Sequence, residues 1–161
     1  MVREILFREA QSGLSARAVA LPDKAPQSCE FLGDLLSGGP VAIPSLHAMW
    51  TGPEISCPLP EAEIPAGWAH AVLPPENATM FPAAGDVILA YVPPRAWGGV
   101  PHAIFDIGLF YAPGGRLLLP VGWVAGSLVA QVVPEDLADL RRACEEIRRT
   151  GACTVTVEAL A

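Results

Sequence analysis

Residues 45–54 read Ser-Leu-His-Ala-Met-Trp-Thr-Gly-Pro-Glu, and this stretch decides the expected fold. It completes an uncharged strand candidate, Val41–Trp50, and turns at Thr51–Pro53 into a second candidate, Glu54–Leu59. Glycine and proline are the residues that such a tight turn needs. Because Pro58 has no backbone N–H to donate, the second strand is predicted to be short or to lie at a sheet edge.

The flanking sequence supplies more strands and two helices. Val2–Phe7 and Leu14–Leu21 alternate apolar and polar residues on either side of a glycine turn, which predicts a hairpin. Ala25–Leu36 has proline in its first turn and an apolar stripe, and Glu135–Thr150 repeats apolar residues at helical spacing before a glycine. Both segments are therefore predicted to be helices.

The remaining pattern predicts a barrel. Further strand candidates are Asp86–Val92, Ala103–Tyr111, Trp123–Val133 and Cys153–Glu158, with a short segment at Leu117–Leu119 and an irregular proline-rich stretch over residues 60–85. About eight short strands separated by glycine and proline favour a closed or nearly closed antiparallel β-barrel. The chain is thus predicted to be one mainly β domain over residues 1–161, with the two helices covering the open ends of the barrel.

Charge excludes several classes of partner. The 161 residues include 10 basic and 17 acidic side chains, a formal net charge of −7. Nucleic acids and anionic lipids both need a basic face, so neither is an expected partner. The longest uncharged tract, Leu117–Pro134, contains proline and glycine and is predicted to form two strands instead of a membrane span. Charges at Arg3 and Arg8 leave no room for an apolar signal segment, and a cytoplasmic location is expected.

Cofactor and metal motifs are missing from the sequence. The four cysteines form no C-x-x-C pair, and Cys29 and Cys144 fall on apolar helix stripes, as buried thiols do. His47, His70 and His102 have no metal-ligand spacing. No glycine-rich phosphate loop is present either. The sequence therefore predicts no cofactor and no metal.

His47 and Glu54 are the candidate catalytic residues. A histidine among apolar neighbours is more often a core residue, but Glu54 follows the tight turn and could fold back towards it. A carboxylate beside an imidazole fixes its tautomer and raises its basicity. Trp50, between them, is expected to contact the substrate.

Four more residues are candidates for substrate binding. Glu76 and Asn77 follow two prolines, and form either a structural turn or a rigid loop at the barrel mouth. Trp97 belongs to a glycine-flanked loop that is either a mobile flap or an oligomer contact, and His102 lies just beyond it. Asp106 interrupts an apolar strand, and we expect it to point outward into solvent.

Five stretches carry a resemblance to a known family. They are Ala25–Phe31, Ser45–Glu54, Pro75–Thr79, Ala84–Val87 and Gly108–Tyr111. In this order they resemble a bacterial family of unknown function with a cyclophilin-like barrel, and the likeness implies that fold. Cyclophilins carry Phe-His-Arg where this chain has Leu46-His47-Ala48. The prolyl-isomerase activity that the resemblance implies therefore lacks its arginine.

Two functions remain open from the sequence. The first is binding or proton-transfer chemistry, of isomerase or hydrolase type, on a small neutral or weakly polar compound such as an amide or lactam in a barrel pocket. The second is a peptide-binding or peptidyl-prolyl isomerase module. The low charged fraction of 17% also predicts a homo-oligomer, by base rate a dimer, with Trp97 near the contact.

Overall fold

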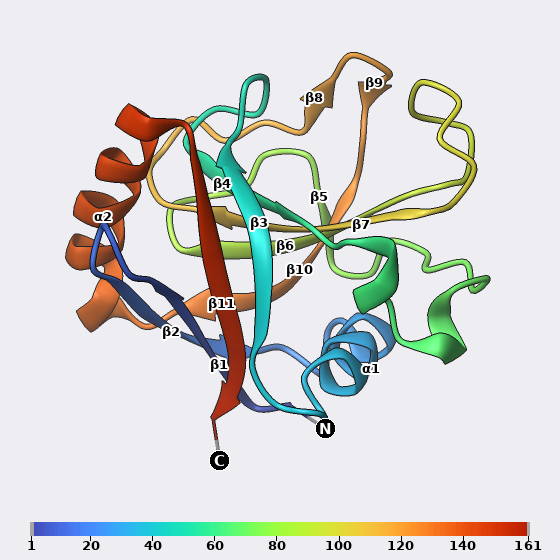
Figure 1. Cartoon of the computed structure of the whole chain (residues 1–161), viewed down its shortest axis with the longest axis horizontal. Helices are drawn as coiled ribbons and strands as arrows, with labels where there is room; N and C mark the ends of the chain where they lie inside the picture. Colours follow the sequence, from blue (N-terminus) through green and yellow to red (C-terminus); the bar gives the residue numbers. More distant parts are fainter. Residues whose placement is uncertain (1, 161) are drawn as a thin grey trace.

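The chain begins with the expected hairpin (Figure 1). In the computed structural model, which describes residues 2–160, β1 (Glu4–Glu9) pairs antiparallel with β2 (Leu14–Ala20). Every second side chain of β2 is buried, as the alternation of a strand with one covered face requires. The hairpin thus presents one apolar face to the core.

The other predicted strands and helices follow in the predicted order with shifts at their ends, and β5, β9 and three 3₁₀ turns are additional. The strands are β3 (Val41–His47), β4 (Glu54–Pro58), β5 (Ala78–Thr79), β6 (Asp86–Val92), β7 (Ile104–Phe110), β8 (Leu118–Leu119), β9 (Gly122–Trp123), β10 (Gly126–Val132) and β11 (Ala152–Leu160). The helices are α1 (Pro26–Leu35) and α2 (Leu137–Thr150), and the 3₁₀ turns are η1 (Glu61–Glu63), η2 (Ala66–Trp68) and η3 (Pro134–Asp136).

Eight of these strands close into a barrel. Their order is β2-β1-β11-β3-β4-β7-β6-β10, every neighbouring pair is antiparallel, and β2 also pairs with β10 to complete the ring. β5 adds to the outer edge of β10, and β8 pairs only with β9 in a separate ribbon. Within residues 2–160 the fold is therefore the mainly β antiparallel barrel with two helices that the sequence predicts.

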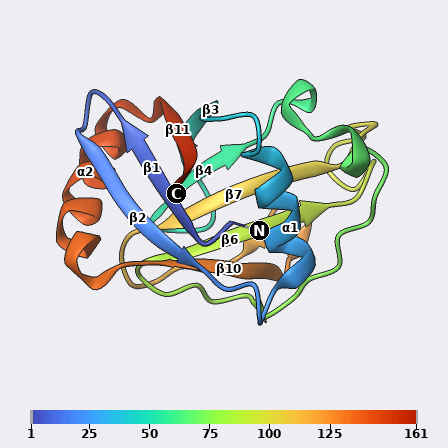
Figure 2. The same ribbon diagram turned by 90° about the horizontal axis from the view of Figure 1, so that it is seen from below.

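The two helices lie towards opposite ends of the barrel (Figure 2). α1 buries Cys29, Phe31 and Leu32, and α2 buries Cys144 and Ile147, so both predicted apolar stripes face the core. No helix among the described residues is long and apolar enough to cross a membrane.

Two predicted strands differ from the structure. The segment Trp123–Val133 is divided between β9 and β10. β4 is short, as expected, but it lies inside the sheet between β3 and β7. Pro58 is tolerated there because β3 pairs only with Ile55 and Ser56, so the missing N–H removes no bond to β3.

The interior of the barrel is filled by apolar side chains. Phe31 stacks on Phe105 with ring centroids 4.6 Å apart, and Phe7, Ile43 and Ile107 are fully buried around them. Such a close-packed core leaves no room for a ligand. The cavities described below lie on the outer surface of the barrel.

Candidate functional site

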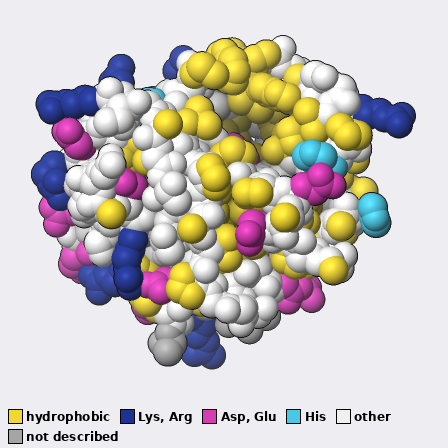
Figure 3. All heavy atoms as spheres, in the orientation of Figure 1, with side chains coloured by type: hydrophobic (Ala, Val, Ile, Leu, Met, Phe, Trp, Pro, Cys, Tyr) yellow, Lys and Arg dark blue, Asp and Glu magenta, His cyan; other side chains and the backbone are white. Residues whose placement is uncertain are grey.

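An apolar cavity of about 360 Å³ opens on the outer face of the barrel, over strands β4 and β7. Its walls come from the end of β3, the β3–β4 loop, the loop before β7 and the segment around β8. Figure 3 shows hydrophobic side chains gathered around a hollow in this part of the surface. Only a few polar side chains, at the floor, interrupt this lining.

Strand register sets the floor of the cavity. β4 pairs with β7 so that Ser56 lies opposite Gly108 and Pro58 lies opposite Asp106. Because side chains alternate along a strand, Glu54, Ser56 and Asp106 point to the outer face, whereas their neighbours point into the core. The pairing thus brings two carboxyl groups, 52 positions apart in the sequence, to one patch of floor.

Gly108 makes room for the first carboxyl group. A β-carbon built on Gly108 would overlap Oε1 of Glu54, so the carboxyl group of Glu54 lies directly over the glycine. No other residue type fits there without displacing Glu54. The glycine therefore serves close approach, and its backbone needs no unusual angle.

Glu54 is buried, and its surroundings raise the pKa of its carboxyl group. Its side chain accepts a hydrogen bond from Oγ1 of Thr51 at Oε2. Burial, reinforced by the negative charge of Asp106, raises the pKa of Glu54 to about 8, and the hydrogen bond from Thr51 only partly opposes this. At neutral pH Glu54 therefore carries a proton, and Oε1 is the oxygen left to hold it.

Asp106 is the second carboxyl group. Oγ of Ser56 donates to Oδ2 at 2.6 Å, whereas Oδ1 is buried and has no hydrogen-bond partner among residues 2–160. Burial raises the pKa of Asp106, and the bond from Ser56 opposes this rise. Asp106 does point out of the barrel, as expected, but the cavity walls cover it, so the expected solvation is wrong.

Two tryptophans form part of the rim. Trp50 and Trp97 come from loops more than forty residues apart and meet edge to face, with ring centroids 5.7 Å apart. Both were expected at a substrate site, and the structure brings them together at one cavity. With Leu46, Ile104 and Leu117 they make the walls apolar.

His47 does not join this site. It lies opposite Ile55 in the β3–β4 pairing, on the core side of the sheet, whereas Glu54 faces outward. Its Nε2 is 2.8 Å from the hydroxyl of Tyr111 and its Nδ1 is 3.0 Å from the carbonyl of Ala48. Burial lowers the pKa of His47, which favours the neutral ring. The expected His47–Glu54 pair is therefore not formed.

Glu76 and Asn77 do not line the cavity, and their side chains form hydrogen bonds to the backbone of other segments. Oε2 of Glu76 accepts the backbone N–H of Ser28 at 2.9 Å, and Oε1 accepts the backbone N–H of Gln27 at 3.3 Å. Asn77, with a left-handed φ of 47°, donates its side-chain N–H to the carbonyl of Leu128 at 3.0 Å. These bonds satisfy the first N–H groups of α1, so Glu76 caps that helix from a distant loop.

Glu76→Ala is expected to lower the free energy of unfolding by about 1–2 kcal/mol, because the start of α1 loses its acceptors. Chemical denaturation measures this change. Glu63→Ala, at an exposed glutamate, is the control and is expected to be neutral. Equal stability of the two variants would mean that Glu76 does not cap the helix.

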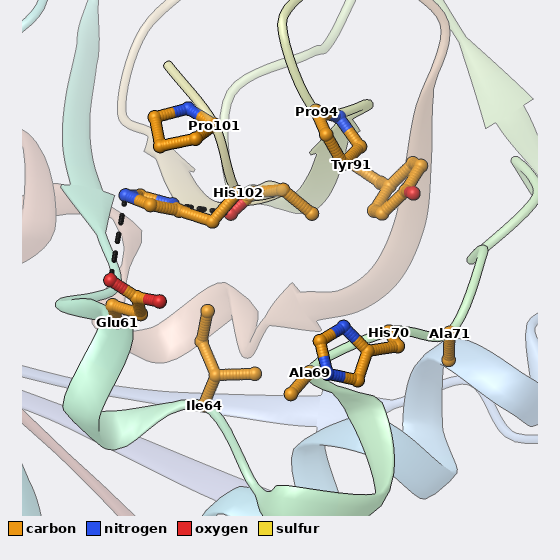
Figure 4. A pocket seen from close by; sticks show the side chains of 10 residues that line it. Glu61, Ile64, Ala69, His70, Ala71, Tyr91, Pro94, Pro101 and His102 are labelled. Carbon is orange, nitrogen blue, oxygen red and sulfur yellow. Dashed lines mark hydrogen bonds and ion pairs between the residues drawn. The ribbon is translucent and has the colours of Figure 1, made fainter.

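His102 lines a different cavity, of about 330 Å³ (Figure 4). Its Nε2 is 3.8 Å from Oε2 of the exposed Glu61, and His70 and Tyr91 lie across the opening. Glu61 and His70 are exposed, and Tyr91 and His102 are partly buried, whereas Glu54 is buried. No group of three or more histidine, cysteine or acidic side chains within residues 2–160 is arranged to hold a metal ion.

Sequence reasoning considered Asp106 but not its partnership with Glu54. The signal in the sequence was the carboxylate of Asp106 inside an apolar strand, followed two positions later by Gly108. A carboxylate on the outer face of a sheet is ordinarily solvated. Here the loops that fold over the sheet cover Asp106, and the sequence does not show this.

Comparisons with solved structures agree with the fold. The structure of McbB in complex with tryptophan is similar to this chain, with a TM-score of 0.64 and 16% sequence identity. The match covers 96% of this chain and 44% of the McbB chain. The chain thus spans less than half of McbB. A cyclophilin-type peptidyl-prolyl cis-trans isomerase of Cryptosporidium parvum matches 100% of this chain and 99% of its own, with a TM-score of 0.53 and 9% identity. At such identities the likeness concerns the fold alone.

Sequence comparison identifies the family. No curated protein matches the chain significantly. The model of one family, described as a protein of unknown function, DUF3830, matches residues 9–159 and so nearly the whole barrel. The chain therefore belongs to the DUF3830 family.

Proposed function

We propose that the protein binds a small neutral compound in the outer cavity and transfers protons to and from it with Glu54 and Asp106. The observation that carries this proposal is the pair of covered carboxyl groups beneath apolar walls, one of them protonated at neutral pH. We assign the donor role to Glu54, whose pKa is raised to about 8, and the acceptor role to Asp106, because two carboxyl groups in one site can supply an acid and a base at the same time. His47, expected to be catalytic, has no part in this proposal.

The chemistry follows from the protonation states. Glu54 donates its proton to a carbonyl oxygen of the ligand while Asp106 removes a proton from a neighbouring C–H group, which yields an enol. When a C=C bond of the ligand is conjugated with the enol, Asp106 gives its proton to the far carbon of that bond while Glu54 takes back the hydroxyl proton. The double bond is thereby shifted and the pair is restored. In the hydrolytic version Asp106 takes a proton from a water molecule that attacks the carbonyl carbon, and Glu54 gives its proton to the amide nitrogen. The C–N bond then breaks to release a carboxylic acid and an amine, and proton exchange with water restores the pair.

The cavity favours neutral ligands. Among its described lining residues there is no lysine or arginine, and an anion would meet the negative charge of Asp106. Apolar walls with a few convergent polar groups are the usual form of a small-molecule site. An amide or lactam remains our proposed ligand class, and the tryptophan complex of McbB supports small-molecule binding by this fold.

The experiment screens neutral amides and lactams by thermal shift and follows each hit by NMR in deuterated water. Wild-type protein is expected to catalyse deuterium incorporation. Glu54→Gln and Asp106→Asn keep the shape of the site but can neither give nor take a proton, so exchange is expected to slow by about 10²–10⁴-fold.

The control is Glu30→Gln, which changes an exposed glutamate and is expected to behave like wild type. The double variant Glu54→Ala/Asp106→Ala is expected to lose the thermal shift caused by the hits. Undiminished exchange in both amide variants, or an unchanged shift in the double variant, would refute the proposed function.

The similarity to a cyclophilin-type isomerase supports a second candidate, a peptidyl-prolyl isomerase or peptide-binding module. Against it, Ala48 occupies the position where the resemblance calls for arginine, and it lines the cavity. A proline-peptide isomerisation assay separates the two functions, and we expect rates no faster than the uncatalysed reaction, which takes tens of seconds or longer.

We further propose that the chain forms a homodimer through apolar surface beside this cavity, with Trp97 near the contact. Met49 is 71% exposed and Phe81 is 65% exposed, and Phe81 packs on the exposed Trp123. Large exposed apolar side chains in contact with one another are typical of interaction sites. Light scattering over a dilution series is expected to give twice the mass of one chain, and Phe81→Ser or Trp97→Ser should weaken the dimer. A constant monomer mass would contradict this.

A further inference from the structure

We propose that the cavity selects amides whose C=O and N–H lie on the same edge, namely lactams with a free N–H, and rejects trans secondary amides and N-substituted lactams. This inference rests on the proposed function, because it assumes that Glu54 and Asp106 contact the ligand. It goes further in naming which amides are bound and by which atoms.

One oxygen of each carboxyl group has no hydrogen-bond partner among residues 2–160. Oε2 of Glu54 is occupied by the hydroxyl of Thr51, and Oδ2 of Asp106 is occupied by the hydroxyl of Ser56. Oε1 of Glu54 and Oδ1 of Asp106 remain, on the same face of the sheet. With one proton on Oε1, the floor offers one donor and one acceptor. Because both atoms belong to the floor of the cavity, a ligand that satisfies both must direct one acceptor and one donor towards the same side.

A cis amide has this arrangement. In a small ring the amide is held cis, so that C=O and N–H point the same way, whereas an open-chain secondary amide is trans and points them in opposite directions. The cis form of an open-chain amide costs about 2.5–4 kcal/mol. An N-substituted lactam and a prolyl peptide bond both lack the N–H, and each would leave Oδ1 of Asp106 buried without a donor.

The walls add a preference for a planar, apolar ring. Trp50 and Trp97 stand at the rim, and aliphatic side chains from β3, β6 and β7 complete the walls. Aromatic faces and edges contact flat rings favourably. A lactam fused to an aromatic ring therefore matches both the floor and the walls of a cavity of about 360 Å³.

Three probes of similar size test the inference at pH 7. Oxindole is a fused lactam with a free N–H, N-methyloxindole lacks the N–H, and acetanilide is a trans secondary amide. NMR titration is expected to give oxindole at least tenfold tighter binding than either of the others. This margin corresponds to one lost hydrogen bond to a charged group.

Two variants test whether Asp106 and Glu54 cause the preference for oxindole. Asp106→Ala removes the acceptor, so oxindole is expected to fall to the affinity of N-methyloxindole. Glu54→Gln still offers an N–H donor over Gly108 and is expected to keep the preference for oxindole, although it cannot transfer a proton. Glu30→Gln is the matched surface control.

The outcomes distinguish the two proposals. Equal binding of oxindole and N-methyloxindole to wild type, with both lost in Asp106→Ala, would overturn the cis-amide preference and leave the proposed function intact. Binding of oxindole that Asp106→Ala does not change would overturn both proposals. Failure of oxindole to bind wild type would also overturn the inferred ligand class.

Discussion

Glu54→Gln is expected to make the protein more stable than wild type above pH 8, and the advantage should disappear towards pH 4. The folded state raises the pKa of Glu54 from 4.5 to about 8, so the folded protein binds this proton more tightly than the unfolded chain does. The resulting stabilisation is complete below pH 4.5 and is lost as the pH rises through about 8. Glutamine imitates the neutral acid at every pH and removes this loss.

The size of the effect follows from the pKa shift. At about 1.4 kcal/mol per pKa unit, the stability of the variant relative to wild type is expected to change by about 5 kcal/mol between pH 4 and pH 9. Asp106 is also buried and its pKa is raised, so it adds a pH dependence of the same sign. Chemical denaturation at intervals from pH 4 to pH 9 measures the difference.

Glu30→Gln is the control for this experiment, because it makes the same chemical change at an exposed position. Its stability difference from wild type is expected to be flat with pH. Parallel pH curves for wild type and Glu54→Gln would contradict the protonated state of Glu54, and with it the donor that the proposed chemistry needs.

Gly108→Ala is the second substitution with a large expected effect. The new β-carbon would overlap Oε1 of Glu54 and lie 3.1 Å from Cε2 of the buried Phe110. Overpacking of this kind costs about 1–3 kcal/mol. It also moves the carboxyl group that we propose to contact the ligand, so ligand affinity is expected to fall with stability. Denaturation and ligand titration measure the two effects.

A double-mutant cycle identifies the cause of that loss. In a Glu54→Ala background the overlap with Oε1 is gone, so Gly108→Ala is expected to cost at least 1 kcal/mol less there. Gly38→Ala is the control, since nothing lies within 4 Å of its added β-carbon. Additive costs for the two substitutions would show that Gly108 is not required for the placement of Glu54.

The local elements of the fold are readable from the sequence because their signals are local. The alternation in Leu14–Leu21 predicts β2 within one residue, and the glycine after Thr150 marks the end of α2. Gly151 has a φ of 81°, and its N–H bonds to the carbonyl of Ile147, which is how a glycine ends a helix. Such signals depend on the backbone conformations that individual residues allow.

The candidate site is less readable because it depends on pairing between distant strands. His47 and Glu54 are close in sequence, yet the β3–β4 register directs them to opposite faces of the sheet. Pro58 predicted a strand that is either short or at a sheet edge, and β4 is short. Only the structure shows that β4 lies inside the sheet, where it pairs on both sides because its proline lies beyond the residues that contact β3. A shift of one residue in register would exchange the faces, and no local pattern fixes this.

The sequence by itself determined the class of the fold, the order of its strands and helices, and the two tryptophans that meet at the cavity rim. Turn residues and hydrophobic periodicity act over a few positions, so they can be read without a structure. Only the tertiary structure decided that Glu54 and Asp106 share a covered floor. Burial under loops distant in sequence raises both pKa values, and the charge of Asp106 raises that of Glu54 further. Both causes depend on distances in the folded chain, which composition does not contain.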